Sequence, residues 1–283
     1  MRLLGHSIAR MYVTTIILLV FLAGASAYML GQLPYALLFS VLICAAMEIA
    51  IKRLYQGQGA KIPFSGIITG LIIGGVAPIS APLLPVLAAC AAAILSKFFI
   101  KPRGVNVFNP AAAGLLIMGL LSVGSSWWAA SSINIGGTAV SLALVLVVAA
   151  YESRRLMLAF SFVAASILLS VMSSAQLTAG SLAVGMIGVN YFFAFLMLTE
   201  PKTSPPRSTA QIVYGVYVAV IYFALTAELP PSLYLGAILA FIALLLGNLT
   251  YAVYRKAGGV GGISGLLLHA QAGYAGHDPA SST

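Results

Sequence analysis

Acidic side chains are scarce in this chain of 283 residues. It has five Asp and Glu against fourteen Lys and Arg, and only 7% of its residues are charged. A soluble domain carries about 25% charged residues, whereas 61% of this sequence is hydrophobic. This composition argues against an ordinary water-soluble domain, and it predicts a protein whose solvent is lipid.

Cysteine and histidine are scarce as well. Cys44 and Cys90 lie singly inside apolar stretches, which predicts small, buried, hydrophobic side chains. A metal cluster held by cysteines of this chain alone is excluded, because such clusters need four ligands. His6, His269 and His277 lie near the two ends of the chain, which excludes a haem held by two histidines inside the membrane.

The cations fall into six clusters that are separated by apolar sequence. Short loops rich in Lys and Arg stay in the cytoplasm, so the pattern predicts a protein that crosses the inner (cytoplasmic) membrane many times, with both ends in the cytoplasm. Because the charges are spread over six loops, the pattern argues against a nucleic-acid surface. The clusters are Arg2 and Arg10; Lys52, Arg53 and Lys61; Lys97, Lys101 and Arg103; Arg154 and Arg155; Lys202 and Arg207; Arg255 and Lys256.

Apolar runs long enough to cross a bilayer, about 20 residues each, predict about ten transmembrane helices. The expected fold is an all-α membrane domain over residues 1–256, followed by a flexible cytoplasmic tail over residues 257–283. Five spans and then five more suggest two inverted halves. Trp127 and Trp128 are expected in the outer interfacial belt. The helix cores are expected to begin near Tyr12, Pro34, Ser65, Pro82, Asn109, Gly136, Leu156, Gly180, Thr209 and Ser232.

Two of these helices look too short to cross the membrane. As helices, Gly66–Ala77 would rise about 18 Å and Pro110–Val123 about 21 Å, against a hydrocarbon core of about 30 Å. Short helices at membrane depth are tolerated where protein or a cavity covers their ends, and exposed N–H groups there suit an anionic or polar ligand. We therefore expect a cavity for a ligand or an ion, with a tightly packed bundle in thinned lipid as the alternative.

Three polar segments interrupt the apolar background. In the first, Ser65 and Thr69 share one helix face and Gly66 allows close backbone approach, so the segment could form a site or a helix-packing face. In the second, Asn109 suits a helix N-cap and Pro110 the first helical position.

The third polar segment is Thr199–Pro206, which includes Lys202 and Thr203. It also holds Glu200, one of only five acids in the chain. Outside a binding site, the simplest role for Glu200 is an ion pair with Lys202 or Arg207 at the headgroup boundary.

A few other polar residues lie inside the expected spans. Glu48 precedes Lys52 by four residues, the favoured order for a helical ion pair, and we expect a structural pair that reaches toward the interface. A carboxylate on an ion path is the alternative. Asn190 and Asn248 are expected to join helices by hydrogen bonds, although both could line an ion path.

Four stretches resemble, in order and with compatible spacing, the D subunit of Rnf complexes and the B subunit of the Na⁺-translocating NADH:quinone reductase. They are Ser65–Leu71, Val105–Gly114, Gly136–Ser141 and Met197–Pro205, within a resemblance that runs from about residue 51 to residue 256. The resemblance implies a ten-span subunit of an ion-translocating electron-transfer complex, which works with other integral-membrane and peripheral subunits.

The resemblance also implies a flavin. Family members carry flavin mononucleotide (FMN) esterified to a threonine in a Ser-Gly-Ala-Thr motif, but the corresponding loop here, Gly124–Ile133, has no threonine. Covalent FMN is therefore not expected. Non-covalent FMN or riboflavin would lie between the two short helices and the third polar segment. The candidate cofactor-binding residues are Ser65, Gly66, Thr69, Asn109, Pro110, Thr199, Glu200, Lys202 and Thr203.

Two other functions fit the same sequence. The short helices would also suit a channel or transporter for a small polar solute or ion, and the family's fold resembles that of urea channels. The chain could alternatively be a scaffold that anchors redox partners. The sequence contains no hydrolytic constellation, so we expect no independent enzymatic activity, only a role as an electron-transfer or non-catalytic subunit.

Overall fold

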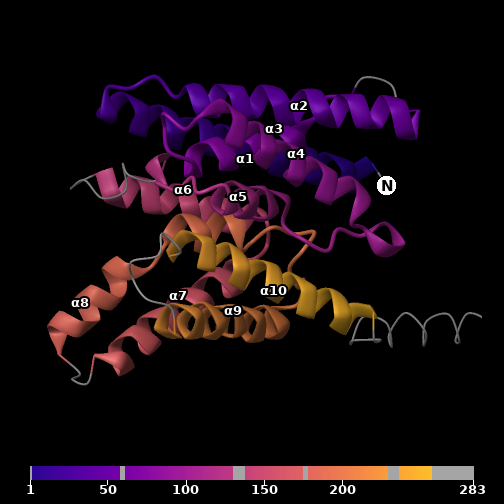
Figure 1. Ribbon diagram of the computed structural model, residues 1–283. Coiled ribbons are helices and arrows are strands. Elements are labelled where there is room, and N and C mark those ends of the chain that lie inside the picture. The colour runs from indigo at the N-terminus through magenta and orange to yellow at the C-terminus, as the bar shows by residue number, and fades with distance from the viewer. Residues whose placement is uncertain (1, 58–60, 130–137, 175–177, 229–235, 257–283) are drawn as a thin grey trace, which may run out of the picture.

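The computed structural model describes residues 2–57, 61–129, 138–174, 178–228 and 236–256. In those ranges every regular element is a helix, which confirms the all-α prediction, and the helices pack side by side in a bundle (Figure 1). The α-helices are α1 (Arg2–Leu30), α2 (Tyr35–Gln56), α3 (Phe64–Val76), α4 (Leu83–Phe99), α5 (Pro110–Leu120), α6 (Thr138–Glu152), α7 (Leu156–Ser173), α8 (Ala179–Gly188), α9 (Ser208–Glu228) and α10 (Gly236–Lys256), with short helices η1 (Pro102–Gly104) and η3 (Phe193–Met197).

The apolar runs and their flanking signals located these helices well. Helices α2 to α5 and α7 to α9 each begin within one residue of the predicted start. Among the described residues, five helices are long and apolar enough to cross a membrane: α1, α2, α7, α9 and α10. Their length and composition fit a membrane-embedded protein. The threading of ten spans and the two inverted halves stay predictions.

The predicted short helices are short in the structure. Helix α3 has 13 residues and α5 has 11, which correspond to about 20 Å and about 17 Å along the axis. Both therefore fall well short of a hydrocarbon core of about 30 Å.

The eighth predicted span is broken rather than continuous. Helix α8 ends at Gly188, and η3, a short π-helix, begins at Phe193. Between them the side-chain oxygen of Asn190 accepts a hydrogen bond from the backbone N–H of Phe193 at 2.9 Å. Asn190 therefore lies at a break in this span, where its side chain caps the start of a new helical segment.

Glycines on one face of α3 bring it into backbone contact with α2. Gly66, Gly70 and Gly74 recur every four residues and so share one face. A Cβ atom on Gly70 would lie 2.5 Å from the Cα atom of Val41, and one on Gly74 would lie 2.3 Å from the Cα atom of Leu37. This face is a small-residue packing surface of the kind that membrane helices use for close association.

The two tryptophans close the far end of α3. Trp128 is only 3% exposed, and its ring N–H donates to the carbonyl of Gly74 at 2.8 Å. The backbone N–H groups of Ser126 and Trp127 both donate to the carbonyl of Val76. Trp128 is buried because the last carbonyls of a short helix need donors inside the protein, and the placement of the two tryptophans in an outer belt stays a prediction.

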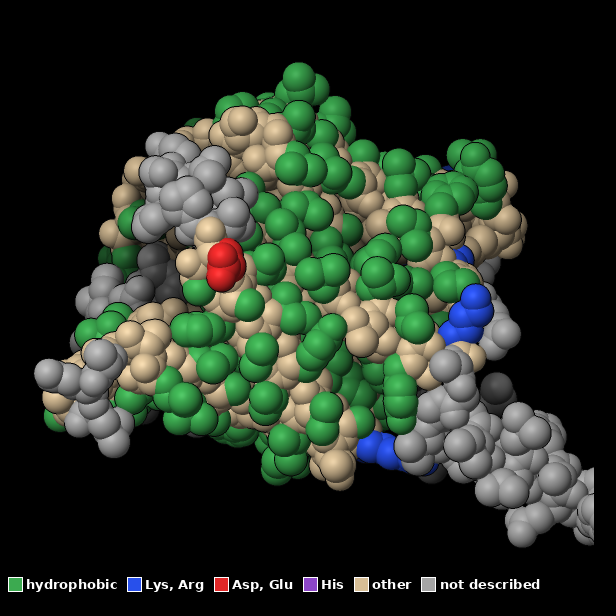
Figure 2. Space-filling model, turned by 60° about the horizontal axis from the view of Figure 1, so that its bottom comes forward, with side chains coloured by type: hydrophobic (Ala, Val, Ile, Leu, Met, Phe, Trp, Pro, Cys, Tyr) green, Lys and Arg blue, Asp and Glu red, His purple; other side chains and the backbone are tan. Residues whose placement is uncertain are grey.

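The cation clusters gather at one end of the bundle. The N-terminus of α1 and the C-terminal ends of α2, α4 and α10 lie at that end (Figure 1), and Lys and Arg side chains appear at one edge of a largely apolar face (Figure 2). Side chains from five of the six clusters line one cavity. Arg10, from the remaining cluster, pairs with Glu152 at 3.1 Å.

The glycine face of α3 predicts the effect of one added methyl group. We expect Gly74→Ala to lower the free energy of unfolding by about 2 kcal/mol, because the new Cβ would overlap the backbone of α2 and neither helix can give way locally. The midpoint of thermal unfolding can be followed with a thiol-reactive dye, since Cys44 and Cys90 are both free and buried. The matched control is Gly24→Ala in α1, where a Cβ atom meets nothing within 4 Å. Equal melting temperatures for the two variants would contradict the packing argument.

Candidate functional site

Two adjoining cavities lie at the cationic end of the bundle. The smaller one, of about 290 Å³, is called the inner cavity, and the larger one, of about 760 Å³, is called the outer cavity. Both are lined by Tyr12, Ser65, Pro201 and Lys202. Of the nine residues predicted from sequence as a cofactor site, seven line the inner cavity: Ser65, Thr69, Asn109, Pro110, Thr199, Glu200 and Lys202.

The first polar segment contributes one face of α3. Ser65 and Thr69 share that face as predicted, and the Thr69 hydroxyl donates to the carbonyl of Ser65 at 2.8 Å. Gly66 lies on a different face of α3, against α2. A Cβ atom added to it would lie 2.8 Å from the carbonyl oxygen of Cys44 and 2.9 Å from Oε2 of Glu48. The structure therefore places Gly66 against α2, outside the lining of the inner cavity.

The second polar segment begins α5 as its residue types predict. The side-chain oxygen of Asn109 accepts from the backbone N–H of Ala112 at 3.0 Å, and Pro110 is the first helical residue. The amide nitrogen of Asn109 also donates to the carbonyl of Met197 at 2.8 Å. One side chain thus caps α5 and joins the second segment to the end of η3, just before the third segment.

Asn248, on α10, forms hydrogen bonds with the start of α5, with the third polar segment and with α9. It is 1% exposed, and its side-chain oxygen accepts from the backbone N–H of Asn109 at 2.8 Å. Its amide nitrogen donates to the carbonyl of Thr203 at 3.3 Å and to the hydroxyl of Tyr214 at 2.7 Å. The predicted role of Asn248 in joining helices is confirmed, and its partners lie on α5, on α9 and in the third polar segment.

The third polar segment is folded on itself by its own hydroxyl groups. The Thr199 hydroxyl donates to the carbonyl of Phe195 at 2.6 Å, and the buried Thr203 hydroxyl donates to Oε2 of Glu200 at 3.1 Å. Thr203 does not line the inner cavity and instead holds the loop in shape. In the described part of the chain Glu200 forms no salt bridge with Lys202 or Arg207, so its acceptor contact is with Thr203 rather than with a cation.

Among the described residues, Glu200 is the one carboxyl that lines the inner cavity. Burial raises the pKa of this carboxyl from 4.5 to about 7, although Lys202 and the Thr203 hydroxyl favour its charged form. The desolvation of the charge outweighs both of these attractions. Glu200 is therefore able to hold or release a proton near neutral pH.

A buried ionic triad lies beside the cavities and was only partly predicted. Glu48 is 1% exposed and bridges Lys52 at 2.5 Å and Lys97 at 2.6 Å. The predicted pair of Glu48 and Lys52 forms, with the carboxylate buried between two helices and the Lys52 side chain 24% exposed. Sequence reasoning missed Lys97 on α4. Lys97 lies in an apolar helix that contains no acid, and this could have predicted that it pairs with a carboxylate on another helix.

Comparisons with known proteins do not identify the chain: no protein-family model and no curated protein matches it. The resemblance to the Rnf D subunit therefore stays an expectation from the sequence stretches named above. The geometry of the two cavities supplies the independent ground for a function.

The contacts of Asn248 predict a large effect of its removal. We expect Asn248→Ala to lower the free energy of unfolding by about 3 kcal/mol, because the N–H of Asn109, the carbonyl of Thr203 and the hydroxyl of Tyr214 each lose a buried partner. Thermal unfolding in lipid nanodiscs measures the difference. The control is Thr250→Ala, an exposed position two residues further along α10, which should change stability by less than about 0.5 kcal/mol. Similar losses in both variants would show that Asn248 holds nothing together.

The raised pKa of Glu200 predicts how stability depends on pH. The carboxyl binds its proton more tightly in the folded state, with a pKa of about 7, than in the unfolded state, at 4.5. The folded state is therefore penalised progressively as the pH rises from about 4.5 through 7, and the penalty is constant above that. We expect the melting temperature to fall over this range in the native chain and to fall less in Glu200→Gln. In Glu152→Gln, whose acid pairs with exposed Arg10, the native slope should remain, and an unchanged slope in Glu200→Gln would disprove the assignment.

Proposed function

We propose that this chain is a membrane subunit of an ion-translocating electron-transfer complex, similar to the D subunit of Rnf complexes, and that its inner cavity holds a non-covalent flavin. In this proposal ten spans, arranged as two inverted halves, cross the inner membrane with both ends in the cytoplasm. Other membrane and peripheral subunits complete the electron path. The main support is that three of the resembled stretches, which are far apart in sequence, meet around the inner cavity.

The lining of the inner cavity suits the ring system of a flavin. Ile68, Ile72, Phe195 and Leu196 supply apolar walls, and although half of the lining residues are polar, most of the exposed cavity surface is apolar. Ligand pockets commonly combine apolar walls with a small number of polar groups that fix orientation, in volumes of about 300–1,000 Å³. The inner cavity lies at the lower limit of that range, and it adjoins the larger outer cavity.

A bound flavin would supply one- and two-electron transfer, and residues of this chain would hold it. Ser65, Thr69 and Thr199 offer hydroxyl groups on two sides of the inner cavity. Glu200 offers a carboxyl that titrates near neutral pH at the same wall. These groups would orient the ligand and could exchange a proton with it.

No covalent attachment is part of this proposal. The loop that carries the flavin-bearing threonine in the resembled family has no threonine here. Its described part, up to Ala129, packs against the end of α3 through Ser126 and Trp128. The remaining loop residues, 130–133, lie outside the described ranges.

The absorption spectrum of the purified chain tests the proposal. We expect a flavin spectrum whose colour is released on denaturation, because the flavin is held without a covalent bond. Thr15→Trp should lower the retained flavin at least about tenfold, since Thr15 lines the inner cavity and the indole ring would fill it. Ile17→Trp is the matched control, because Ile17 lies on the same helix with 60% of its side chain exposed. Colour that stays attached after denaturation would disprove the non-covalent assignment.

A channel or transporter for a small polar solute or ion is the second candidate function. The break between α8 and η3 and the short helices α3 and α5 favour it, because these segments place helix ends within the bundle. In that case the purified chain would carry no flavin, and proteoliposomes would show solute flux without any partner subunit. A chain with neither flavin nor flux that copurifies with redox subunits would instead be a scaffold.

A further inference from the structure

The outer cavity has a large excess of positive charge. One carboxylate, from Glu48, faces six cationic side chains across its lining. The cations come from segments that are widely separated in the sequence, so the excess is a product of the fold. They are Lys52, Lys97, Lys101, Arg155, Lys202 and Arg255.

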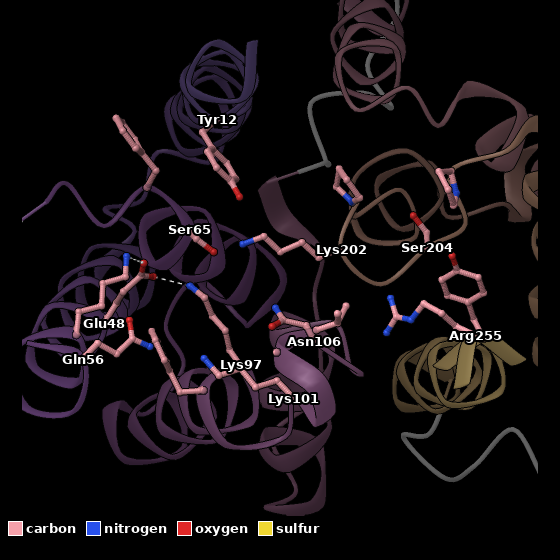
Figure 3. Close-up of a pocket in the computed structure, with 18 of the residues that line it drawn as sticks. Tyr12, Glu48, Gln56, Ser65, Lys97, Lys101, Asn106, Lys202, Ser204 and Arg255 are labelled. Atoms are coloured by element: carbon pink, nitrogen blue, oxygen red, sulfur yellow. Dashed lines mark hydrogen bonds and ion pairs between the residues drawn. The ribbon is translucent and has the colours of Figure 1, made fainter. Parts of the chain in front are cut away.

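The single carboxylate already has partners. Glu48 is bridged by Lys52 and Lys97 (Figure 3). Within the described ranges no carboxylate lies within ion-pair distance of Lys101, Arg155 or the two other cations of the lining. These four cations therefore share one cavity without a carboxylate in ion-pair contact, although Glu200 and Glu48 attract Lys202 at longer range, and their mutual repulsion is only partly offset within the chain.

Arg155 is the most constrained of these four cations. It is 7% exposed, and its guanidinium donates to the hydroxyl of Ser204 at 3.0 Å and to the carbonyl of Pro201 at 3.3 Å. These partners are neutral. A buried guanidinium that has hydrogen bonds but no counter-charge is costly, and an anion in the cavity would remove that cost.

The other three cations lie over aromatic rings. The ammonium of Lys101 is 5.0 Å from the ring centre of Phe98, and that of Lys202 is 5.8 Å from the ring of Tyr12. The guanidinium of Arg255 lies over a tyrosine ring of its own helix at 5.5 Å. Ring faces position a cation but do not neutralise it. Figure 3 shows the Lys202 ammonium directed toward Ser65 and Tyr12, the Lys97 ammonium joined to Glu48, and Arg255 reaching in from the opposite side.

We propose that the outer cavity binds a phosphate-bearing ligand, either a soluble phosphate compound or the headgroup of a membrane lipid. Phosphate oxygens accept charge-assisted hydrogen bonds from both Arg and Lys. The first turn of α3 also lines the cavity at Phe64 and Ser65, and its N–H groups suit an anion. A volume of about 760 Å³ leaves room for the organic part of the ligand. The site depends on the charge of the cavity and not on the presence of a flavin.

Calorimetric titration of the purified full-length chain with pyrophosphate, in nanodiscs of neutral phosphatidylcholine, tests a soluble ligand. We expect saturable binding, and we expect the double variant Lys101→Gln and Arg255→Gln to weaken it at least about tenfold, because each cation lost removes a charge-assisted contact. The matched control removes Arg53 and Lys256 in the same way. These two are exposed cations that lie outside the lining of the cavity, so pyrophosphate affinity should stay within about twofold.

A second arm tests a lipid ligand in the same proteins. Vesicles of phosphatidylcholine with and without phosphatidic acid are used to reconstitute the chain, and the lipid that stays bound after detergent extraction is measured by mass spectrometry. Retention of phosphatidic acid that is lost in the Lys101 and Arg255 double variant supports the site with a lipid as its ligand. Absence of binding in both arms, or equal binding by the two double variants, overturns the proposal. A chain that binds pyrophosphate but carries no flavin would keep this site and lose the function proposed above.

Discussion

The hydrogen bond from the backbone N–H of Asn109 to the side chain of Asn248 is the contact on which the rest of the site depends. Inside a membrane a polar group finds no water, so a buried amide has to be satisfied by other parts of the protein. Asn248 meets this demand with groups of Asn109, Thr203 and Tyr214 at once. These partners fix the start of α5 and the third polar segment against α9 and α10. The inner cavity is the space that remains between the elements held in this way.

Local signals predicted the helices well, but the faces that the helices turn toward one another were not predictable. Capping and hydrophobic length are properties of adjacent residues, so the starts of α3 and α5 follow from the sequence. In lipid, however, both the core and the surroundings of a helix are apolar, so hydrophobic periodicity does not mark the buried face. Leu37 is 7% exposed and its neighbour Leu38 is 60% exposed, although the two residues are identical. The orientation of Gly66 and the burial of Trp128 depend on helix rotation in the same way.

Positive charge in this chain has two consequences that the sequence alone does not separate. Clusters of Lys and Arg predict which ends of the helices stay on one side of the membrane. This prediction needs only the positions of the Lys and Arg residues in the sequence. The fold then brings five of those clusters around a single cavity, which no count reveals. Lys97 illustrates the difference, because it belongs to a loop-flanking cluster in the sequence yet is 6% exposed and paired with Glu48 in the structure. The charges from which the orientation is predicted thus also create a strongly positive cavity.

The shortness of α3 and α5 connects these features. A helix that crossed the full hydrocarbon core would need about 20 residues, whereas α3 has 13 and α5 has 11. The missing turns leave volume within the bundle at its cationic end, and Ser65 and Asn109, at the first turns of the two helices, line that volume. Its inner part is largely apolar and its outer part is cationic, and Lys202 lines both. A ligand with an apolar ring system and a phosphate group would satisfy the two parts together, whereas a neutral ring would leave the outer charges without a counter-ion.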